Sequence, residues 1–570
     1  MAPMPTQESQ PLSKSRHAAT LISILIAVNG IYILVSTLVE QISAHRGTHL
    51  SNLQVDLPLL LGISVLYLST LLHRRKRTAW LVTMMAYTFY LTLGLTELLS
   101  RTSVREIHLH VILRILVFPL IIIVLLVAFQ REFVVKSDIR GFGVAARFSA
   151  IILLVALLYG VVGFQLVDES DFHHELSIPS SIHYTIDQFN ITTKDPLKPY
   201  TKRARLFNDS LSFVSSAAVL YAVLSLFQPI RSRFSDQTDQ RELLHGLMKR
   251  YGAPSEEFFK LWPHDKQYFF DPSGQSGLAF HTFRSVALCV SDPVGDPKHF
   301  SSLLTNFRTM CFNNDWLPAF IHVSGQHRHL YKQNDFTMQK LGQEAVVNLD
   351  HFNSQVSDNK YFRQIRNRFS KQGYSNELLQ PPHHSAVLDR LRAISDDWLS
   401  RGGRSERGFA MGYFSSEYMQ QCQILVARDA AGTIQSFVNV IPADFDTEEA
   451  TYDLLRNASG SLGNINDYVL MSLIGHLHGQ GYRRLNLGLA PLGGLDKEEE
   501  EERTLIDNLL QFAYANGDRF YSFSGLYRFK AKYEPDWQDR FIAYQDGMRG
   551  FSRTMTALTR CMKKVVKRAA

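Results

Sequence analysis

Hydrophobic residues are distributed unevenly along the 570 residues of the chain. Before Pro229, long apolar stretches alternate with short basic loops, and after it short apolar runs alternate with polar residues. A hydrocarbon core of about 30 Å needs about 20 apolar residues per helix. The first part therefore predicts a bundle of about six membrane-spanning helices, at Thr20–Val39, Leu57–Leu72, Ala79–Leu99, Val111–Phe129, Phe148–Leu166 and Leu211–Gln228.

The basic loops predict the orientation of this bundle, because cytoplasmic loops carry an excess of Lys and Arg. With six spans, the basic clusters that follow the second, fourth and sixth spans fall on the same side as the N-terminal tail. We therefore expect both termini, and the whole part after Pro229, in the cytoplasm.

The second part alternates strand-like and helix-like segments, which predicts an α/β or α+β domain with two similar-sized subdomains. Predicted strands are Gly277–Phe283, Ser285–Ser291, Ala319–His322, Gln423–Arg428, Thr433–Ile441 and Arg484–Leu489, and predicted helices are Pro297–Asn313, Lys360–Gln372, Ala386–Ser400 and Asp467–Gly479. The predicted organisation is a tail (1–17), a transmembrane domain (18–230), a linker (231–242), a cytoplasmic domain (243–546) and a basic tail (547–570).

Composition narrows the chemistry only a little. The net charge is +7, which suits cytoplasmic loops and also a polyanionic partner such as RNA or an anionic lipid surface. The four cysteines, Cys289, Cys311, Cys422 and Cys561, are isolated and form no CxxC pair. This spacing favours reduced thiols over a disulfide framework or a zinc site, and no metal or cofactor is predicted.

A basic helix is predicted at residues 360–371. Phe362, Ile365 and Phe369 form one apolar stripe, while the other positions carry several Lys and Arg and no acid. A solvated face normally mixes both signs of charge, so this pattern favours phosphate contact, with Arg363, Arg366 and Arg368 as the candidate residues.

Two further motifs carry candidate chemistry. Asp453 and Arg456 stand three apart, so on a helix or turn they would share a face and could pair, either as a structural ion pair or at a catalytic site. Residues 481–494 predict a strand that ends in a Gly-rich loop, whose backbone N–H groups could approach a phosphate or an oxyanion. Lys530 and Lys532, flanked by aromatic residues, suit a nucleotide end that requires charge and stacking.

Taken in order, these motifs resemble the C-terminal domain of the bacterial aminoacyl-phosphatidylglycerol synthases, the multiple peptide resistance factor family. The resemblance covers roughly Leu243–Tyr544 and implies two tandem acetyltransferase-like (GNAT) subdomains. It rests on DPVGD at Asp292–Asp296, the FRQIRNR helix, YDLLR at Tyr452–Arg456, GYRRLNLGLAPLGGL at Gly481–Leu495 and FYSFSGLYRFKAKYEPDW at Phe520–Trp537.

The resemblance implies transfer of an amino acid, typically lysine or alanine, from aminoacyl-tRNA to the glycerol hydroxyl of phosphatidylglycerol. Such a reaction lowers the negative charge of the bacterial inner membrane and gives resistance to cationic antimicrobial peptides. Because the donor is an activated ester, the site must position the hydroxyl and stabilise an oxyanion, and it needs no covalent nucleophile.

The residue roles follow as hypotheses. Asp453 would position or deprotonate the lipid hydroxyl, or bind the donor's α-amino group, and Arg456 would orient Asp453 or hold a phosphate. The candidate residues for binding the tRNA 3′ end and the donor are Arg528, Lys530, Lys532, Gly488 and Gly493. The helix bearing Arg363, Arg366 and Arg368 would contact tRNA or lipid phosphate.

Two alternatives stay open at this point. One is a membrane-anchored acyltransferase that uses acyl-CoA on a lipid or envelope polymer, and the other is a lipid transporter with a cytoplasmic sensor domain. Family members of full length carry further N-terminal spans that form a flippase. We therefore expect this chain to make the lipid, alone or as a homo-oligomer, and to leave export to a separate flippase. The amino acid that is transferred is not readable from the residues.

Overall fold

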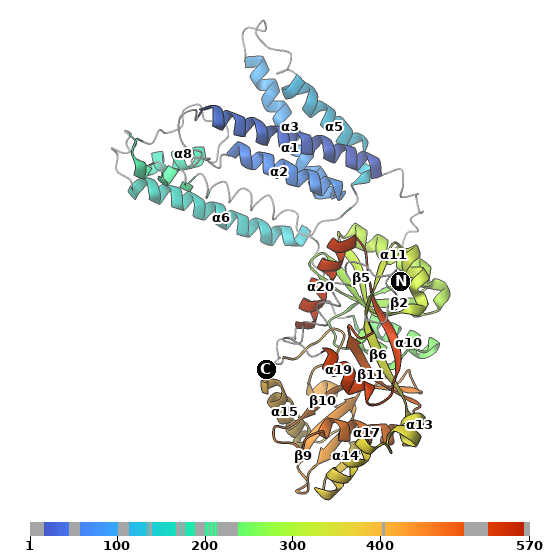
Figure 1. Cartoon of the computed structure of the whole chain (residues 1–570). Coiled ribbons are helices and arrows are strands. Elements are labelled where there is room, and N and C mark those ends of the chain that lie inside the picture. Colours follow the sequence, from blue (N-terminus) through green and yellow to red (C-terminus); the bar gives the residue numbers. More distant parts are fainter. Residues whose placement is uncertain are drawn as a thin grey trace. The chain divides into compact units, whose positions relative to one another are not determined.

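The chain divides into two compact units. The first comprises Met1–Arg231 with Phe312–Asp315, and the second comprises Ser232–Cys311 and Trp316–Ala570. The computed structural model describes residues 16–44, 57–100, 113–133, 135, 139–166, 172, 177–188, 200–204, 206–208, 210–211, 214, 237–401, 405–494 and 523–563 (Figure 1).

The described part of the first unit is helical. Its helices are α1 (Arg16–Ala44), α2 (Leu57–His73), α3 (Arg77–Ser100), the π-helix η3 (Leu113–Val117), α5 (Phe118–Ala128), the 3-10 helix η4 (Gln130–Glu132), α6 (Ile139–Leu166) and α8 (Ile178–Gln188). The first five predicted spans thus coincide with helices. Large apolar side chains point outward from them, as with Leu21, Val28 and Val35 of α1, each more than half exposed.

Fewer helices than predicted have the dimensions of a membrane span. Among the described residues, two segments are long and apolar enough to cross a bilayer, Ala18–Thr37 and Arg77–Thr96. Three further apolar segments, Gly62–His73, Phe118–Ala128 and Ala150–Leu166, are shorter. Most of the sixth predicted span lies outside the described residues, as do residues 231–236 of the linker and 564–570 of the tail. Among the described residues the structure therefore gives two candidate spans by length and composition, and the predicted number of six is not confirmed.

The second unit is built on one mixed sheet of twelve strands (Figure 1). The order is β1-β2-β3-β5-β12-β6-β11-β10-β9-β8-β7, with β4 beside β2. The strands are β1 (Gln267–Phe270), β2 (Ser276–Phe283), β3 (Val286–Val290), β4 (Val294–Gly295), β5 (Leu317–Ser324), β6 (Thr337–Asn348), β7 (Ser375–Leu379), β8 (Gln423–Arg428), β9 (Ile434–Val440), β10 (Glu449–Asn457), β11 (Arg484–Pro491) and β12 (Asp536–Tyr544). The predicted α/β or α+β class is confirmed.

The two ends of the sheet repeat one pattern. In each, antiparallel strands lead into a single parallel pair, β3 with β5 and β10 with β11. The helix between the strands of each pair is α11 (Phe300–Asn313) in the first half and α17 (Ile465–Gly479) in the second. At the centre, β12 pairs with β5 of the first half and with β6, and β6 pairs in turn with β11. The last strand of the chain thus lies inside the sheet, at the seam between the halves.

Helices cover both faces of the sheet, and alternate residues of β8 and β9 point into two different cores. Ile424 and Phe437 pack in a core with residues of α15, while Leu425 and Val438 pack in another with residues of α14 and α17. The remaining helices are α10 (Thr238–Tyr251), η5 (Ser255–Lys260), η6 (Pro297–His299), η7 (Gly325–His327), α12 (Arg328–Gln333), α13 (Leu349–His351), η8 (Phe352–Val356), α14 (Lys360–Lys371), α15 (Ser385–Ser400), α16 (Ser416–Met419), α19 (Phe523–Ala531) and α20 (Gly547–Lys563).

Two predicted segments have structural roles. In the DPVGD motif, Asp292 accepts hydrogen bonds from the N–H of Ser324 and the hydroxyl of Tyr331, at 2.8 and 3.0 Å. Gly295 has φ +113°, and a Cβ there would lie 2.2 Å from the carbonyl oxygen of Gln275. This motif is therefore a fixed turn. Residues 547–563, predicted as a basic tail, form α20, which buries Thr554, Ala557 and Cys561 among other residues.

Candidate active site

Asp453 lies in the middle of β10, and two donors hold its carboxylate. The backbone N–H of Gly412 donates to Oδ1 at 3.2 Å, and the hydroxyl of Tyr418 donates to Oδ2 at 3.0 Å. A Cβ at Gly412 would stand 2.0 Å from Oδ2, so glycine is needed for this approach. Burial raises the pKa of Asp453 to about 6, although both hydrogen bonds oppose the increase. A carboxylate with this pKa can act as a general base near neutral pH.

Arg456 pairs with a residue other than Asp453. Its Nη1 and Nη2 donate to the two carboxylate oxygens of Glu406 at 2.8 and 2.6 Å, and Nη1 also donates to the Ser395 hydroxyl. The guanidinium carbon lies 5.2 Å from the ring centre of Trp398. The prediction that Asp453 and Arg456 share a helix or turn is wrong, because both lie on a strand that carries a bulge between Tyr452 and Leu455. Arg456 is thus placed to fix the surroundings of Asp453.

The short helix η5 braces this site from the first half. The ring of Tyr418 stacks on Phe258 and Trp262, with centroids 6.2 and 5.3 Å apart. Ser255 Oγ and Thr451 Oγ1 are 2.5 Å apart, which ties the start of η5 to β10 two residues before Asp453. The donor to Asp453 is therefore held by packing between the two halves.

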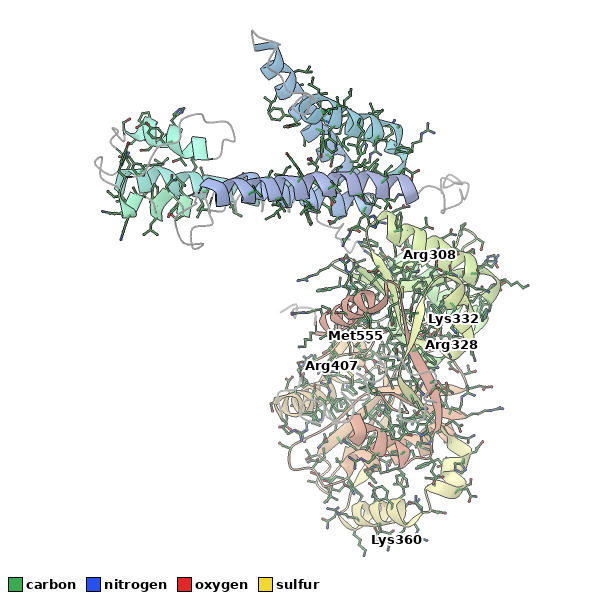
Figure 2. The ribbon with its side chains drawn as sticks, turned by 45° about the horizontal axis from the view of Figure 1, so that its top comes forward. Arg308, Arg328, Lys332, Lys360, Arg407 and Met555 are labelled. Atoms are coloured by element: carbon green, nitrogen blue, oxygen red, sulfur yellow. The ribbon has the colours of Figure 1, made fainter. Side chains whose placement is uncertain are left out.

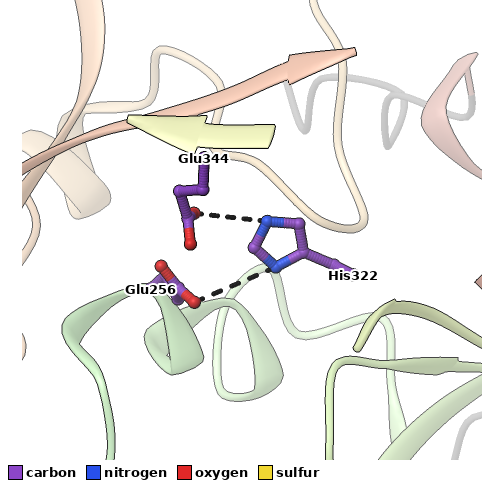
Figure 3. Close-up of side chains that lie close together, drawn as sticks. All are labelled: Glu256, His322 and Glu344. Atoms are coloured by element: carbon purple, nitrogen blue, oxygen red, sulfur yellow. Dashed lines mark ion pairs between the residues drawn. The ribbon is translucent and has the colours of Figure 1, made fainter. Parts of the chain in front are cut away.

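Next to Ser255, Glu256 belongs to a second cluster of charged groups at the seam. Figure 3 shows His322 between Glu256 and Glu344, with Nδ1 4.0 Å from Glu256 and Nε2 3.2 Å from Glu344. Arg540 on β12 pairs with both carboxylates, at 2.9 Å to Glu256. Asn486 on β11 donates to Glu256 as well. The cluster thus combines a residue near the start of the second unit with residues from four strands of the central sheet, β5, β6, β11 and β12.

The pKa values of the two carboxylates in the cluster are shifted in opposite directions. Burial, reinforced by the charge of Glu344, raises the pKa of Glu256. Burial also acts to raise the pKa of Glu344, but the charges of His322 and Arg540 outweigh it and leave this pKa low. Glu256, His322 and Glu344 present ligand atoms within 4.8 Å of one another, a spacing that a metal ion could use. Since Arg540 already supplies a positive charge to both carboxylates, we regard the cluster as an ion-pair network.

Lys530, predicted to bind the tRNA 3′ end, is buried. Its Nζ donates to the carbonyl oxygens of Gly488 and Leu489 at 2.7 and 2.8 Å. Burial lowers the pKa of Lys530 to about 7. Gly488 has φ +79° and lies within β11 at a bulge, not in the loop after the strand, and its N–H is bound by Asn486 Oδ1. The structure therefore places Lys530 as a support of the β11 bulge, out of reach of a polyanion.

Lys532 is held by internal partners. It pairs with Asp467 and donates to the Tyr361 hydroxyl at 3.1 Å, and its Nζ lies 4.4 Å from the ring centre of Phe529. Of the other donor-site candidates, Arg528 is exposed on α19. The N–H of Gly493 donates to the carbonyl oxygen of Ala490 at 3.1 Å. Nothing in these contacts assembles Lys530, Lys532 and the glycines into a single phosphate cradle.

The helix at 360–371 is α14, and its predicted faces are confirmed. Phe362, Ile365 and Phe369 are buried, while Arg363, Arg366 and Arg368 are exposed. Lys360, at the start of α14, projects away from the sheet (Figure 2). Asn359 caps the helix by accepting from the N–H of Phe362 at 3.0 Å.

Sequence reasoning missed most of the partners that define these clusters. Tyr418 and Glu406 lie 35 and 50 residues from their partners on β10, in a stretch without periodic pattern. Glu344 and Arg540 are brought together by the pairing of β6 with β12, and Glu256 joins them from η5. The one local signal was a pair of acids, Glu256-Glu257, just before an apolar run.

Comparison with known proteins shows to which family this domain belongs. The family model described as "Phosphatidylglycerol lysyltransferase, C-terminal" matches residues 245–544, more than half of the chain. The chain belongs to this family. A phosphatidylglycerol lysyltransferase of Bacillus subtilis is 30% identical over 308 residues, which are 53% of this chain and 35% of the relative. A relative of the same name from Staphylococcus epidermidis is 25% identical over 426 residues, 75% of this chain and 47% of the relative.

Solved structures agree with this assignment. The structure of L-PGS from Bacillus licheniformis matches with 28% identity and a TM-score of 0.51, over 59% of this chain and all of the solved one. A C-terminal domain of a putative lysylphosphatidylglycerol synthetase from Agrobacterium fabrum matches with 26% identity and a TM-score of 0.50, over 58% of this chain and 99% of the solved one. The Asp453 site, the seam cluster and α14 all lie within residues 245–544, the segment that the family model matches. The chain spans less than half the length of the curated relatives just named.

Proposed function

We propose that the protein transfers an aminoacyl group, lysyl or alanyl, from aminoacyl-tRNA to the glycerol hydroxyl of phosphatidylglycerol. The observation that carries the proposal is Asp453, a half-buried carboxylate with a pKa of about 6 in a domain that matches the phosphatidylglycerol lysyltransferase family. Its two donors, Gly412 and Tyr418, fix its orientation. A fixed base with this pKa is suited to remove a proton from an alcohol as that alcohol attacks an ester.

The proposed step is a direct transesterification. The lipid hydroxyl oxygen attacks the carbonyl carbon of the aminoacyl ester while its proton passes to Asp453. The tetrahedral intermediate then expels the ribose oxygen of the tRNA, which takes the proton back from Asp453. One C–O bond forms and one breaks, so no covalent enzyme intermediate or redox partner is required. In a variant of this proposal, Asp453 instead binds the α-amino group of the donor.

The surrounding residues support this step in different ways. Arg456, fixed by Glu406, would keep the pocket around Asp453 in place or hold a phosphate. Lys530 would maintain the β11 bulge at Gly488. Lys532 and Arg528 would contact the aminoacyl-tRNA donor. The exposed basic residues of α14, including Arg363 and Arg368, would contact tRNA or lipid phosphate.

We further propose that the domain consists of two GNAT-like subdomains and works at the cytoplasmic face of the bacterial inner membrane. The repeated order of antiparallel strands followed by a parallel crossover supports the first point. The apolar helices α1 and α3, which can cross a bilayer, support the second. A membrane-bound enzyme of this kind would meet phosphatidylglycerol in the bilayer and aminoacyl-tRNA in the cytoplasm.

The test is lipid mass spectrometry after expression of the full chain in a host without aminoacylated lipids. A new phosphatidylglycerol species should appear, and its mass would identify the amino acid. Asp453→Asn should abolish it, whereas the exposed Asp389→Asn on α15 makes the same charge change elsewhere and should leave it. Absence of any new species from membrane-inserted protein, or an active Asp453→Asn variant, would contradict the proposal.

Two further assays separate the alternatives. With purified protein, ribonuclease should stop the reaction if aminoacyl-tRNA is the donor, whereas an acyl-CoA enzyme would be indifferent to it. A transporter with a sensor domain would alter the distribution of lipids between leaflets with no change in total lipid composition.

A further inference from the structure

A pocket beside α14 is lined by hydrogen-bond donors and contains no acid. It has a volume of about 320 Å³ and lies between η8, α14, β7 and α17. Arg366 and Ser370 reach it from α14, Asn353 from η8, and Tyr468 and Ser472 from α17. Met471 is the only aliphatic side chain among the described residues that line it. The pocket thus offers several donors and one positive charge, with Met471 as its single aliphatic side chain among the described lining residues.

Two contacts within the protein fix the orientation of the Arg366 guanidinium. Its Nη2 donates to the carbonyl oxygen of Ser357 at 3.0 Å. Nη1 lies 3.6 Å from Asp358, whose side chain is two-thirds exposed. A guanidinium has five N–H donors in a rigid fork, so these two contacts leave others for a ligand.

A hydrogen-bond chain prepares Tyr468 to donate. The Nε2 of His476 is 2.9 Å from Asn376 Oδ1, and Asn376 Nδ2 donates to the Tyr468 hydroxyl at 3.2 Å. Because the Tyr468 oxygen accepts this bond, its own hydrogen remains for a further acceptor. The ring of Tyr468 is fixed by stacking on Phe369, with centroids 4.3 Å apart and planes 4° apart.

A third residue of the pocket lining, Asn353, carries a side-chain donor that lacks an acceptor. The Nδ2 of Asn353 is buried and has no hydrogen-bond partner among the described residues. A buried donor without a partner lowers the free energy of unfolding, and hydrogen bonding to an acceptor would remove this cost. The oxygens of a phosphodiester accept hydrogen bonds and donate none, which matches this set of donors.

We propose that this pocket binds a backbone phosphate of RNA. The α14 surface would then bind the tRNA through a specific contact in the pocket as well as through general electrostatic attraction. The inference rests on the proposed use of aminoacyl-tRNA. RNA is favoured over a phospholipid because the lining is polar and because the exposed face of α14 is basic over its whole length, with Lys360, Arg363, Arg368 and Lys371. That face would follow the strand on either side of the bound phosphate.

Binding of uncharged tRNA to the full chain in detergent tests the proposal without requiring catalysis. Arg366→Gln should weaken binding about tenfold or more and lower the slope of log K against log salt by about 1. Arg363→Gln removes the same charge from the same helix outside the pocket, and it should cost no more than about threefold. Tyr468→Phe keeps the stacked ring and removes one donor, so it should weaken binding severalfold and leave the salt slope unchanged.

The possible outcomes distinguish a failure of the pocket proposal from a failure of the proposed function. If the wild-type chain fails to bind tRNA, the proposed function fails as well. If it binds and Arg366→Gln behaves like Arg363→Gln, with Tyr468→Phe like wild type, only the pocket proposal is overturned. Vesicles containing phosphatidylglycerol, and inorganic phosphate as a competitor, complete the test. A loss confined to vesicle binding, or phosphate binding without an effect on tRNA, would assign the pocket to another ligand and overturn the proposal.

Discussion

Replacing Asp453 by asparagine should make the protein more stable and inactive. The substitution keeps the shape of the side chain and its two hydrogen bonds. Oδ1 can still accept from the N–H of Gly412, and the new amide can donate to the hydroxyl of Tyr418, which now accepts. What disappears is the negative charge, which burial disfavours at this position.

The magnitude follows from the pKa of Asp453. A rise from 3.8 to about 6 makes the ionised carboxylate cost about 3 kcal/mol in the folded state, since each tenfold change in an acid constant is worth about 1.4 kcal/mol. Below pH 4 both states carry the proton and the cost is absent. Between pH 4 and 6 the folded state binds more protons than the unfolded state, so the free energy of unfolding falls as the pH rises. Above pH 6 the full cost remains.

We therefore expect Asp453→Asn to raise the free energy of unfolding by about 1–3 kcal/mol at pH 8 and by almost nothing at pH 3. Thermal unfolding of the full chain in detergent can be followed by fluorescence, because four of its five tryptophans lie in the second unit. Tyr418→Phe is the companion variant. It removes a donor to the carboxylate and should lower stability at pH 8. An asparagine variant that is less stable than wild type at pH 8 would refute the reasoning, since the charge would then be stabilised.

Three other substitutions probe the supports of the site. Arg456→Met leaves the half-buried Glu406 without its partner and should cost about 1–3 kcal/mol in thermal unfolding, whereas the double variant with Glu406→Met should cost less. Lys530→Met should abolish a rise in stability between pH 7 and 10, because the wild-type lysine has a folded-state pKa of about 7 and an unfolded value near 10.5. Gly488→Ala should cost about 1–2 kcal/mol and also lower the yield of modified lipid. Gly432 has φ +78° in a turn with open space around it, so Gly432→Ala should lower stability without changing the yield of modified lipid.

Periodic patterns made much of the fold predictable. The predicted helix at 360–372 is α14, which begins at Lys360 and ends at Lys371, because its apolar stripe and Asn359 cap are both local signals. Strand β10 was misread, since its Leu454-Leu455 pair and the spacing of Asp453 and Arg456 also suit a helix. Pairing with β9 and β11 fixes it as a strand, and that contact is not visible locally.

The candidate site was predictable only in part, and for a related reason. Asp453 was predicted as a candidate from its motif, but its hydrogen-bond partners Tyr418 and Gly412 are connected to it by no local pattern. Lys530 looked like a surface cation between aromatic residues, yet it is buried against two carbonyl groups. Charge and spacing say which residues can react, whereas burial decides how they do so, and burial is a property of the assembled sheet.

The position of β12 has a consequence for how the protein is made. This strand, Asp536–Tyr544, comes near the end of the chain and pairs with β5 and β6, which precede it by about 200 residues. The first half therefore lacks an inner strand until the ribosome has synthesised about 200 further residues beyond β5 and β6. Until then the facing edges of β5 and β6 are open to incorrect pairing. Premature termination before β12 would thus leave both halves defective, and folding should be slow and depend on protection of the nascent chain.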